Sequence, residues 1–346
     1  MRAAVYERFG GPIEVREVAD PAPAPGEVVV ETMAVGLCRS DYHGWKGTDP
    51  DIVCPHVGGP EFVGRVAAVG TGVQRVRMGD RIVVPFVCGC GTCEPCLLGQ
   101  HQVCRKQEQP GFTRWGALAA YTTIPYADTN AVLVPDSVSD VAAALVGCRV
   151  STAYRGVVER GRLAAGEVLA VHGCGGVGLA AIALGRAMGS TVVAVDIAAD
   201  ALALARAVGA DIVIDASDLS GDGAVPAAVF ELSGGAHVSV DSLGHATTAA
   251  NSVLSLRPLG RHVQIGLFPA AMAEFAISRV IRDELEVLGV HGLSASRFHE
   301  VFALVATGRL DPAAVVTQEL TLDDVAEALP AMGSFATPGV SVVTRL

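Results

Sequence analysis

The feature that most constrains this fold is a glycine-rich turn between an apolar strand and a helix-like segment. The apolar run Val168–Val171 leads into Gly173-Cys-Gly175-Gly-Val-Gly178, and the Ala/Leu-rich segment Leu179–Met188 follows directly. In such a G-x-G-x-x-G turn the first glycine permits a tight turn, the second lets a ligand approach the backbone, and the third lets the helix pack on the strand. The helix N-terminus then faces an anion. The order predicts a dinucleotide-binding unit.

An acidic residue indicates which dinucleotide the turn binds. A second apolar strand ends in Asp196, 18 residues past Gly178. A carboxylate there accepts hydrogen bonds from a ribose diol and repels a 2′-phosphate, and the following segment Ile197–Asp200 contains no arginine. We therefore expect NAD(H) rather than NADP(H). The alternatives to a cofactor site are a glycine turn that binds no ligand and an Asp196 that is only a solvated residue at the end of a strand. The residues expected to bind the cofactor are Gly173, Gly175, Gly176, Gly178 and Asp196.

The pattern along the chain predicts an α/β protein with two lobes and a cleft between them. Residues 150–290 alternate apolar strands with Ala/Leu-rich helices, which is typical of a doubly wound parallel Rossmann sheet. Residues 1–149 contain short strands punctuated by proline and glycine, which indicates a β-rich lobe. Residues 291–346 resume a mixed pattern, and we expect them to return to the first lobe.

Charge and composition restrict the possible partners. The net charge of -11 disfavours nucleic acid and anionic membranes, since both require a basic face. No run approaches the ~18 apolar residues of a membrane span, and the N-terminus lacks the apolar block of a signal peptide. We therefore expect a cytoplasmic protein that acts on a small molecule.

Four cysteines lie close together at Cys90, Cys93, Cys96 and Cys104, within a glycine-containing loop at about 88–104. Four thiolates complete a tetrahedral zinc site and leave no open position, so such a site holds a loop in place and performs no catalysis. The alternative, free surface cysteines, is disfavoured because exposed clustered thiols oxidise. The spacing predicts a structural zinc.

Three further motifs, together with the cysteine loop and the glycine turn, carry a family resemblance. They are Gly36–His43, Gly59–Gly64 and Val76–Val83, and their order is similar to that of the zinc-type medium-chain alcohol dehydrogenases. This resemblance covers essentially the whole chain. It implies a GroES-like catalytic domain at 1–149, an NAD-dependent alcohol dehydrogenase or reductase, and a homo-oligomer, either a dimer or a tetramer.

The resemblance also implies roles for individual residues. Cys38 and Cys148 match two ligands of a catalytic zinc, and Ser40 and His43 match a hydroxyl and an imidazole that relay the alcohol proton to solvent. Asp41 matches a residue that supports this site by a hydrogen bond. The positions flanking the nicotinamide correspond to Thr152 and Val177. Taken alone, Ser40 and His43 would more often be ordinary polar loop residues, and Cys38 and Cys148 ordinary packed thiols.

One position departs from the family pattern. The family has Gly-His-Glu with a zinc-binding histidine, whereas this chain has Gly59-Pro60-Glu61. Proline offers no ligand atom and restricts the residue before it. The third donor must then come from Glu61 or, less plausibly, from His56, because carboxylate oxygens bind zinc at about the same distance as imidazole nitrogens.

Three functions remain open on the sequence. Zinc held by Cys38, Glu61 and Cys148 would support hydride exchange between NAD(H) and a small alcohol, aldehyde or ketone at a site between the lobes. Without that metal, the pocket would direct a hydride from NAD(P)H to an already polarised bond in an enal, enone or iminium ion, with Ser40, His43 or water as the proton source. The third possibility is a nucleotide-binding protein without turnover.

Overall fold

The computed structural model describes residues 1–221, 223–268, 276–334 and 337–346. Their contacts divide the chain into two compact units. The first comprises Met1–Ser151, Gly292–Gly308 and Val316–Leu346, and the second comprises Thr152–His291 and Arg309–Val315. The short segment Arg309–Val315 differs from the sequence-based expectation, because it packs on helices of the second unit.

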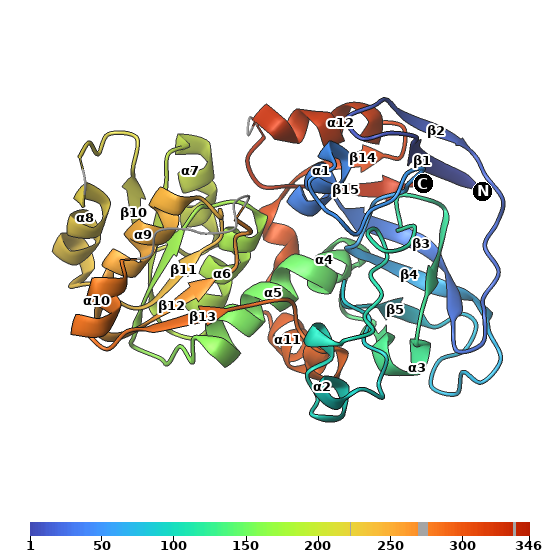
Figure 1. Ribbon diagram of the computed structural model, residues 1–346, viewed down its shortest axis with the longest axis horizontal. Helices are drawn as coiled ribbons and strands as arrows, with labels where there is room; N and C mark the ends of the chain where they lie inside the picture. Colours follow the sequence, from blue (N-terminus) through green and yellow to red (C-terminus); the bar gives the residue numbers. More distant parts are fainter. Residues whose placement is uncertain (222, 269–275, 335–336) are drawn as a thin grey trace. The chain divides into compact units, whose positions relative to one another are not determined.

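The second unit is built on a six-stranded parallel sheet (Figure 1). Its strand order is β10-β9-β8-β11-β12-β13, which is the third, second, first, fourth, fifth and sixth strand of the unit. This doubly wound order confirms the predicted Rossmann fold and places its switch point between β8 and β11, where such sheets bind ligands. The strands are β8 Val168–His172, β9 Thr191–Asp196, β10 Ile212–Asp215, β11 Ala236–Asp241, β12 Leu256–Gln264 and β13 Glu286–Gly289.

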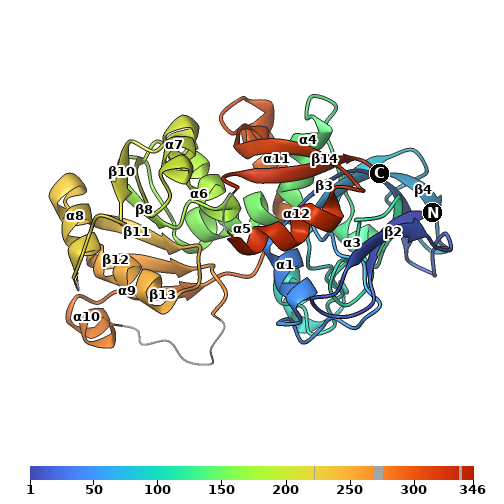
Figure 2. The same cartoon turned by 90° about the horizontal axis from the view of Figure 1, so that it is seen from above.

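Helices cover both faces of this sheet. The pair α6 and α7 contact each other and strands β8 to β10, while α8 and α9 contact each other and strand β11. Figure 2 shows α7 and α9 on opposite sides of the sheet. All five residues of β8 are buried, which explains why its first four residues form a continuous apolar run. The helices are α6 Gly176–Ala187, α7 Ala199–Val208, α8 Ala224–Ser233, α9 Ala246–Leu254 and α10 Ile277–Arg282, with the 3-10 turn η5 Pro312–Val315.

The first unit contains a seven-stranded sheet of order β14-β15-β3-β4-β5-β7, with β6 also paired to β3, and a separate β1-β2 hairpin. Most of its strand pairs are antiparallel, in keeping with the predicted β-rich lobe. The strands are β1 Arg2–Tyr6, β2 Ile13–Glu17, β3 Val28–Gly36, β4 Phe62–Val69, β5 Arg81–Val83, β6 Tyr121–Ile124, β7 Val132–Leu133, β14 Val316–Thr321 and β15 Val340–Arg345.

Short helices complete the first unit and position most of its chemistry-bearing residues. The helices are α1 Arg39–Lys46, α2 Glu94–Leu97, α3 Ala127–Asn130, α4 Asp140–Leu145, α11 Phe298–Ala306 and α12 Val325–Ala331. The 3-10 turns are η1 His101–Val103, η4 Ala295–Arg297 and η6 Met332–Ser334.

A continuous helical segment runs from Asp140 to Arg160 through both units. It consists of α4, a π-helical turn η2 Val146–Val150, α5 Ser151–Tyr154 and a second π-helical turn η3 Arg155–Arg160. The segment is long and apolar enough to cross a membrane, but 83% of its most apolar window is buried inside the protein. Its apolar character is therefore that of a core helix.

Candidate functional site

The glycine turn, Gly173–Gly178, joins β8 to α6 in the second unit. Gly173 has a φ of 93°, which favours glycine, and a Cβ at Gly178 would lie 1.9 Å from the Gly173 carbonyl oxygen. A Cβ at Gly175 would meet nothing within 4 Å. The backbone is thus open to a ligand at Gly175, while at Gly178 the helix packs tightly against the Gly173 backbone. A phosphate-binding turn requires both features.

Asp196 lies at the end of β9 and is tied to this turn. Its Oδ2 accepts a hydrogen bond from the Cys174 backbone N–H at 2.6 Å, and its Oδ1 accepts from Ile197 and Ala198 at 2.7 and 3.0 Å. These bonds fix the carboxylate beside the glycine turn. The arrangement fits a dinucleotide with an unphosphorylated ribose.

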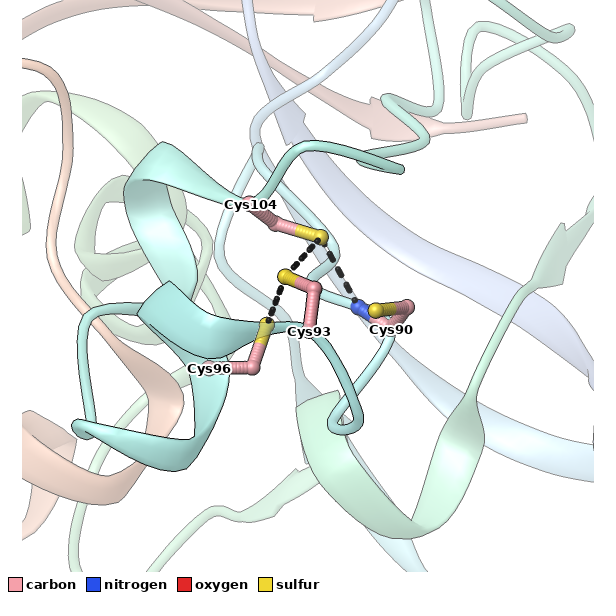
Figure 3. Close-up of side chains that lie close together, drawn as sticks. All are labelled: Cys90, Cys93, Cys96 and Cys104. Atoms are coloured by element: carbon pink, nitrogen blue, oxygen red, sulfur yellow. Dashed lines mark hydrogen bonds between the residues drawn. The ribbon is translucent and has the colours of Figure 1, made fainter.

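The four cysteines of the loop at 88–104 converge (Figure 3). Their sulfur atoms all lie within 4.8 Å of one another, and Cys93 Sγ lies 3.5 Å from Cys96 Sγ and 3.6 Å from Cys104 Sγ. Tetrahedral zinc with Zn–S bonds of about 2.3 Å separates its sulfurs by roughly 3.8 Å, so the donor set fits zinc. Among the described residues this is the only group of at least three His, Cys, Asp or Glu side chains that could hold a metal ion.

The candidate reaction centre lies in the first unit, where β3 leads into α1. Cys38 is the N-cap of α1, and Asp41 in the first turn accepts a hydrogen bond from the Cys38 backbone N–H at 2.9 Å. The other oxygen of Asp41 accepts from the Gly59 N–H at 2.7 Å, which ties the loop before β4 to the helix. Burial raises the pKa of Asp41 to about 7, and the Cys38 thiolate adds to the rise.

Cys38 and Cys148, termed the thiol pair, are brought together from 110 residues apart in the sequence. Cys148 lies in the π-helical turn η2, a distortion common at functional sites. A hydrogen bond from Cys148 lowers the pKa of Cys38 well below its ordinary value, and the same contact raises the pKa of Cys148. The contact therefore favours the thiolate form at Cys38 and the thiol form at Cys148.

Ser40 and His43 follow Cys38 on α1. The Ser40 hydroxyl lies near enough to the Cys38 sulfur to lower the pKa of that thiol, yet its oxygen is buried and forms no hydrogen bond of regular geometry with the described residues. His43 is exposed one helical turn further on. Ser40 thus keeps its hydrogen-bonding capacity for another group.

The two residues that we expect beside the nicotinamide lie in the second unit. The buried Thr152 Oγ1 has no hydrogen-bond partner within the described parts of the chain, and Val177 lies at the start of α6.

Neither Pro60 nor His56, in the segment before β4, supplies a further metal ligand. Pro60 is buried, and it packs so closely on Gly111 that a Cβ there would lie 2.8 Å from the Pro60 nitrogen. The imidazole of His56 is also buried, with Nε2 located 2.9 Å from the Gly111 carbonyl oxygen and its ring packed edge-on against Tyr6. His56 therefore has a structural partner of its own.

Glu61 precedes β4, is fully buried, and forms an ion pair with Arg149. The Arg149 backbone N–H donates to Glu61 Oε1 at 2.8 Å, and Arg149 Nε donates to Oε2 at 2.6 Å. Burial raises the pKa of Glu61, while the guanidinium opposes the rise. Sequence reasoning missed Arg149. The available signal was a basic residue directly after a candidate thiol, together with the need of any buried carboxylate for a counter-charge.

Comparisons with known protein families cover both units. Residues 24–136 match the alcohol dehydrogenase GroES-like domain. Residues 176–307 match the zinc-binding dehydrogenase family. The two matches include the thiol-pair residue Cys38, the four-cysteine loop and the second half of the glycine turn, from Gly176 onward.

Whole-chain comparisons agree. The chain is 32% identical over 327 residues to an alcohol dehydrogenase of Geobacillus stearothermophilus, which covers 94% of this chain and 95% of the relative. The structure of alcohol dehydrogenase TADH from Thermus sp. ATN1 superposes with a TM-score of 0.91 at 30% identity and covers 100% of both chains. An NAD-dependent alcohol dehydrogenase superposes with a TM-score of 0.88 at 31% identity and covers 99% of each chain.

Proposed function

Because the chain belongs to the zinc-type medium-chain alcohol dehydrogenase family, we propose that it exchanges a hydride between NAD(H) and a small alcohol, aldehyde or ketone. The observation that carries the proposal is the glycine turn, which is open at Gly175, closed at Gly178 and flanked by Asp196. The pyrophosphate would bind at the open face, where the α6 N-terminus favours an anion. The Asp196 carboxylate would accept hydrogen bonds from the ribose and repel a 2′-phosphate, so NADH is the preferred reductant.

Residues of the first unit would supply the proton. When bound, NADH would supply a hydride for the carbonyl carbon, and the Ser40 hydroxyl would give its proton to the carbonyl oxygen. His43 then returns a proton to Ser40 from solvent. Alcohol oxidation runs through the same transfers in reverse. The buried Ser40 oxygen, which has no regular hydrogen bond within the described parts of the chain, supports this role. We assign Thr152 and Val177 to the nicotinamide.

The family implies a catalytic zinc, and this chain's donor set does not fit one. Cys38 and Cys148 offer two sulfurs, Pro60 offers no ligand atom, and both oxygens of Glu61 already accept hydrogen bonds from Arg149. A catalytic zinc site has three side-chain ligands from the protein. The proposed proton transfer therefore uses only Ser40, His43 and solvent.

The same observation favours a second candidate function. A substrate polarised by conjugation or by its own charge needs no Lewis acid to accept a hydride. An enal, an enone or an iminium ion meets this condition, and the thiol pair with Ser40 would then serve only to shape the site and supply a proton.

A substrate panel tests both candidates. The protein is mixed with NAD and alcohols, and with NADH and aldehydes, ketones, enals, enones or cyclic imines, while the absorbance of the reduced nicotinamide is followed. Turnover of an alcohol with NAD, or of an aldehyde or ketone with NADH, supports the first function. Turnover confined to enals, enones or imines supports the second. No turnover with any member of a broad panel contradicts both.

A further inference from the structure

We propose that Arg149 holds Glu61 out of metal coordination, so that the chain binds a single zinc, at Cys90, Cys93, Cys96 and Cys104, and none at the thiol pair. The inference rests on the proposed function only for identifying the thiol pair as the reaction centre. Metal content can be measured without turnover, so the two can fail separately.

The contacts of the carboxylate carry the first step. Glu61 Oε1 is bound by the Arg149 backbone N–H, and Oε2 is bound by Arg149 Nε and by the ion pair with Nη2. Arg149 Nη2 also donates to the Leu37 carbonyl oxygen at 2.9 Å, which anchors the guanidinium to the end of β3. Arg149 therefore binds both oxygens of Glu61, and its guanidinium is itself held by a backbone carbonyl oxygen.

The space around the carboxylate is closed as well. A Cβ at Gly36 would lie 2.5 Å from Glu61 Oε2, so the carboxylate rests against the backbone at the end of β3. Turning Glu61 toward the thiol pair would leave the Arg149 guanidinium, which is 4% exposed, without its counter-charge in the protein interior. Breaking a buried pair in this way is strongly unfavourable.

No other described side chain replaces the missing donor. Pro60 has no ligand atom, and the His56 imidazole faces the Gly111 carbonyl oxygen. Among the described residues, only the four-cysteine cluster forms a group of three or more side chains that could hold a metal ion. Cys38, Glu61 and Cys148 do not form a second such group. Two sulfurs alone are fewer than the three protein ligands of a catalytic zinc site.

Zinc content measured by elemental mass spectrometry on protein purified from zinc-supplemented medium tests the proposal. We expect about one zinc per chain in the wild type and in Cys148→Ser, and almost none in Cys96→Ser. Two zinc atoms in the wild type, with one lost in Cys148→Ser, would overturn the proposal even if the enzyme turned over its substrates.

Two gain-of-metal variants sharpen the test. Pro60→His restores an imidazole and should raise the zinc content toward two per chain, whereas the matched control Pro60→Ala should stay at one. Arg149→Met releases Glu61 and should also gain zinc, and the gain should vanish in Arg149→Met with Glu61→Gln. A folded Arg149→Met protein that stays at one zinc contradicts the role of Arg149. If that variant does not fold, a Pro60→His protein that stays at one zinc contradicts the claim that the centre lacks only one donor.

Discussion

Arg149 binds both carboxylate oxygens of Glu61, and it immediately follows Cys148 in the chain. Arg149 of the buried ion pair and Cys148 of the thiol pair therefore share one π-helical turn. Arg149 also donates to the carbonyl oxygen of Leu37, the residue that follows β3. This arrangement couples the stability of the first unit to the residues of its reaction centre.

Breaking this pair on one side should destabilise the protein. Glu61→Gln keeps the size of the side chain but leaves the buried guanidinium unpaired, and we expect a loss of about 3–5 kcal/mol in the free energy of unfolding. Replacing both residues with methionine removes both charges and should recover most of that loss. Urea denaturation of the two variants measures the difference. Equal unfolding midpoints for Glu61→Gln and the wild type would contradict the account.

The Ser40 hydroxyl should matter for the rate and not for nucleotide binding. Ser40→Ala removes the group that we assign to proton transfer, so kcat should fall by about 100-fold or more. Ser40→Thr keeps a hydroxyl and should retain most of the rate. The exposed Ser220→Ala serves as the control. A Ser40→Ala enzyme with unchanged kcat would remove Ser40 from the mechanism, whereas a changed affinity for NADH would point to a structural role.

His172 should make the second unit sensitive to acid. Its side chain is buried at the end of β8, its Nε2 has no hydrogen-bond partner within the described residues, and burial lowers its pKa to about 3. The unfolded chain protonates this histidine below a pH of about 6.5, whereas the folded protein stays neutral until about pH 3. Stability therefore falls as the pH falls through this interval, by about 2–3 kcal/mol near pH 4.5 from this group.

Unfolding experiments at about pH 7.5 and about pH 4.5 test this contribution. His172→Leu cannot be protonated and should lose less stability between the two conditions than the wild type. The exposed His245→Leu should lose as much as the wild type. The same acid sensitivity in all three proteins would assign it to other groups.

The charge of Asp196 should set the choice of nucleotide. Asp196→Asn keeps an oxygen to accept the Cys174 N–H but removes the negative charge that repels a 2′-phosphate. The affinity for NADPH relative to NADH should therefore rise by about tenfold or more, equivalent to about 1.4 kcal/mol. Competition binding of the two nucleotides measures this ratio, with the exposed Asp200→Asn as the control. An unchanged ratio would show that another residue discriminates.

Much of the second unit could be predicted from the sequence because its signals are local. The buried strand Val168–His172, the glycine turn and Asp196 are read from short apolar runs and a fixed spacing. The four-cysteine cluster is equally local, since its members lie within 15 residues of one another. Local patterns of this kind follow from backbone geometry and metal coordination alone.

The contacts of the reaction centre could not be read in the same way. Glu61 and Arg149 are 88 residues apart, and no periodicity links them. The sequence made Glu61 the better candidate for a third zinc donor, but it did not reveal that the fold pairs this carboxylate with Arg149. The packing of Arg309–Val315 on the second unit escaped prediction for the same reason, because it depends on where a distant helix lies.

Titration of the protein with NADH, followed by nicotinamide fluorescence, tests the central claim most directly. We expect the wild type to bind NADH saturably, and Gly175→Ala to bind it about tenfold more weakly or worse at an unchanged Tm, because the added methyl group enters only the open face of the turn. Failure of the wild type to bind either NADH or NADPH would contradict the account, as would a Gly175→Ala protein that binds NADH as tightly as the wild type.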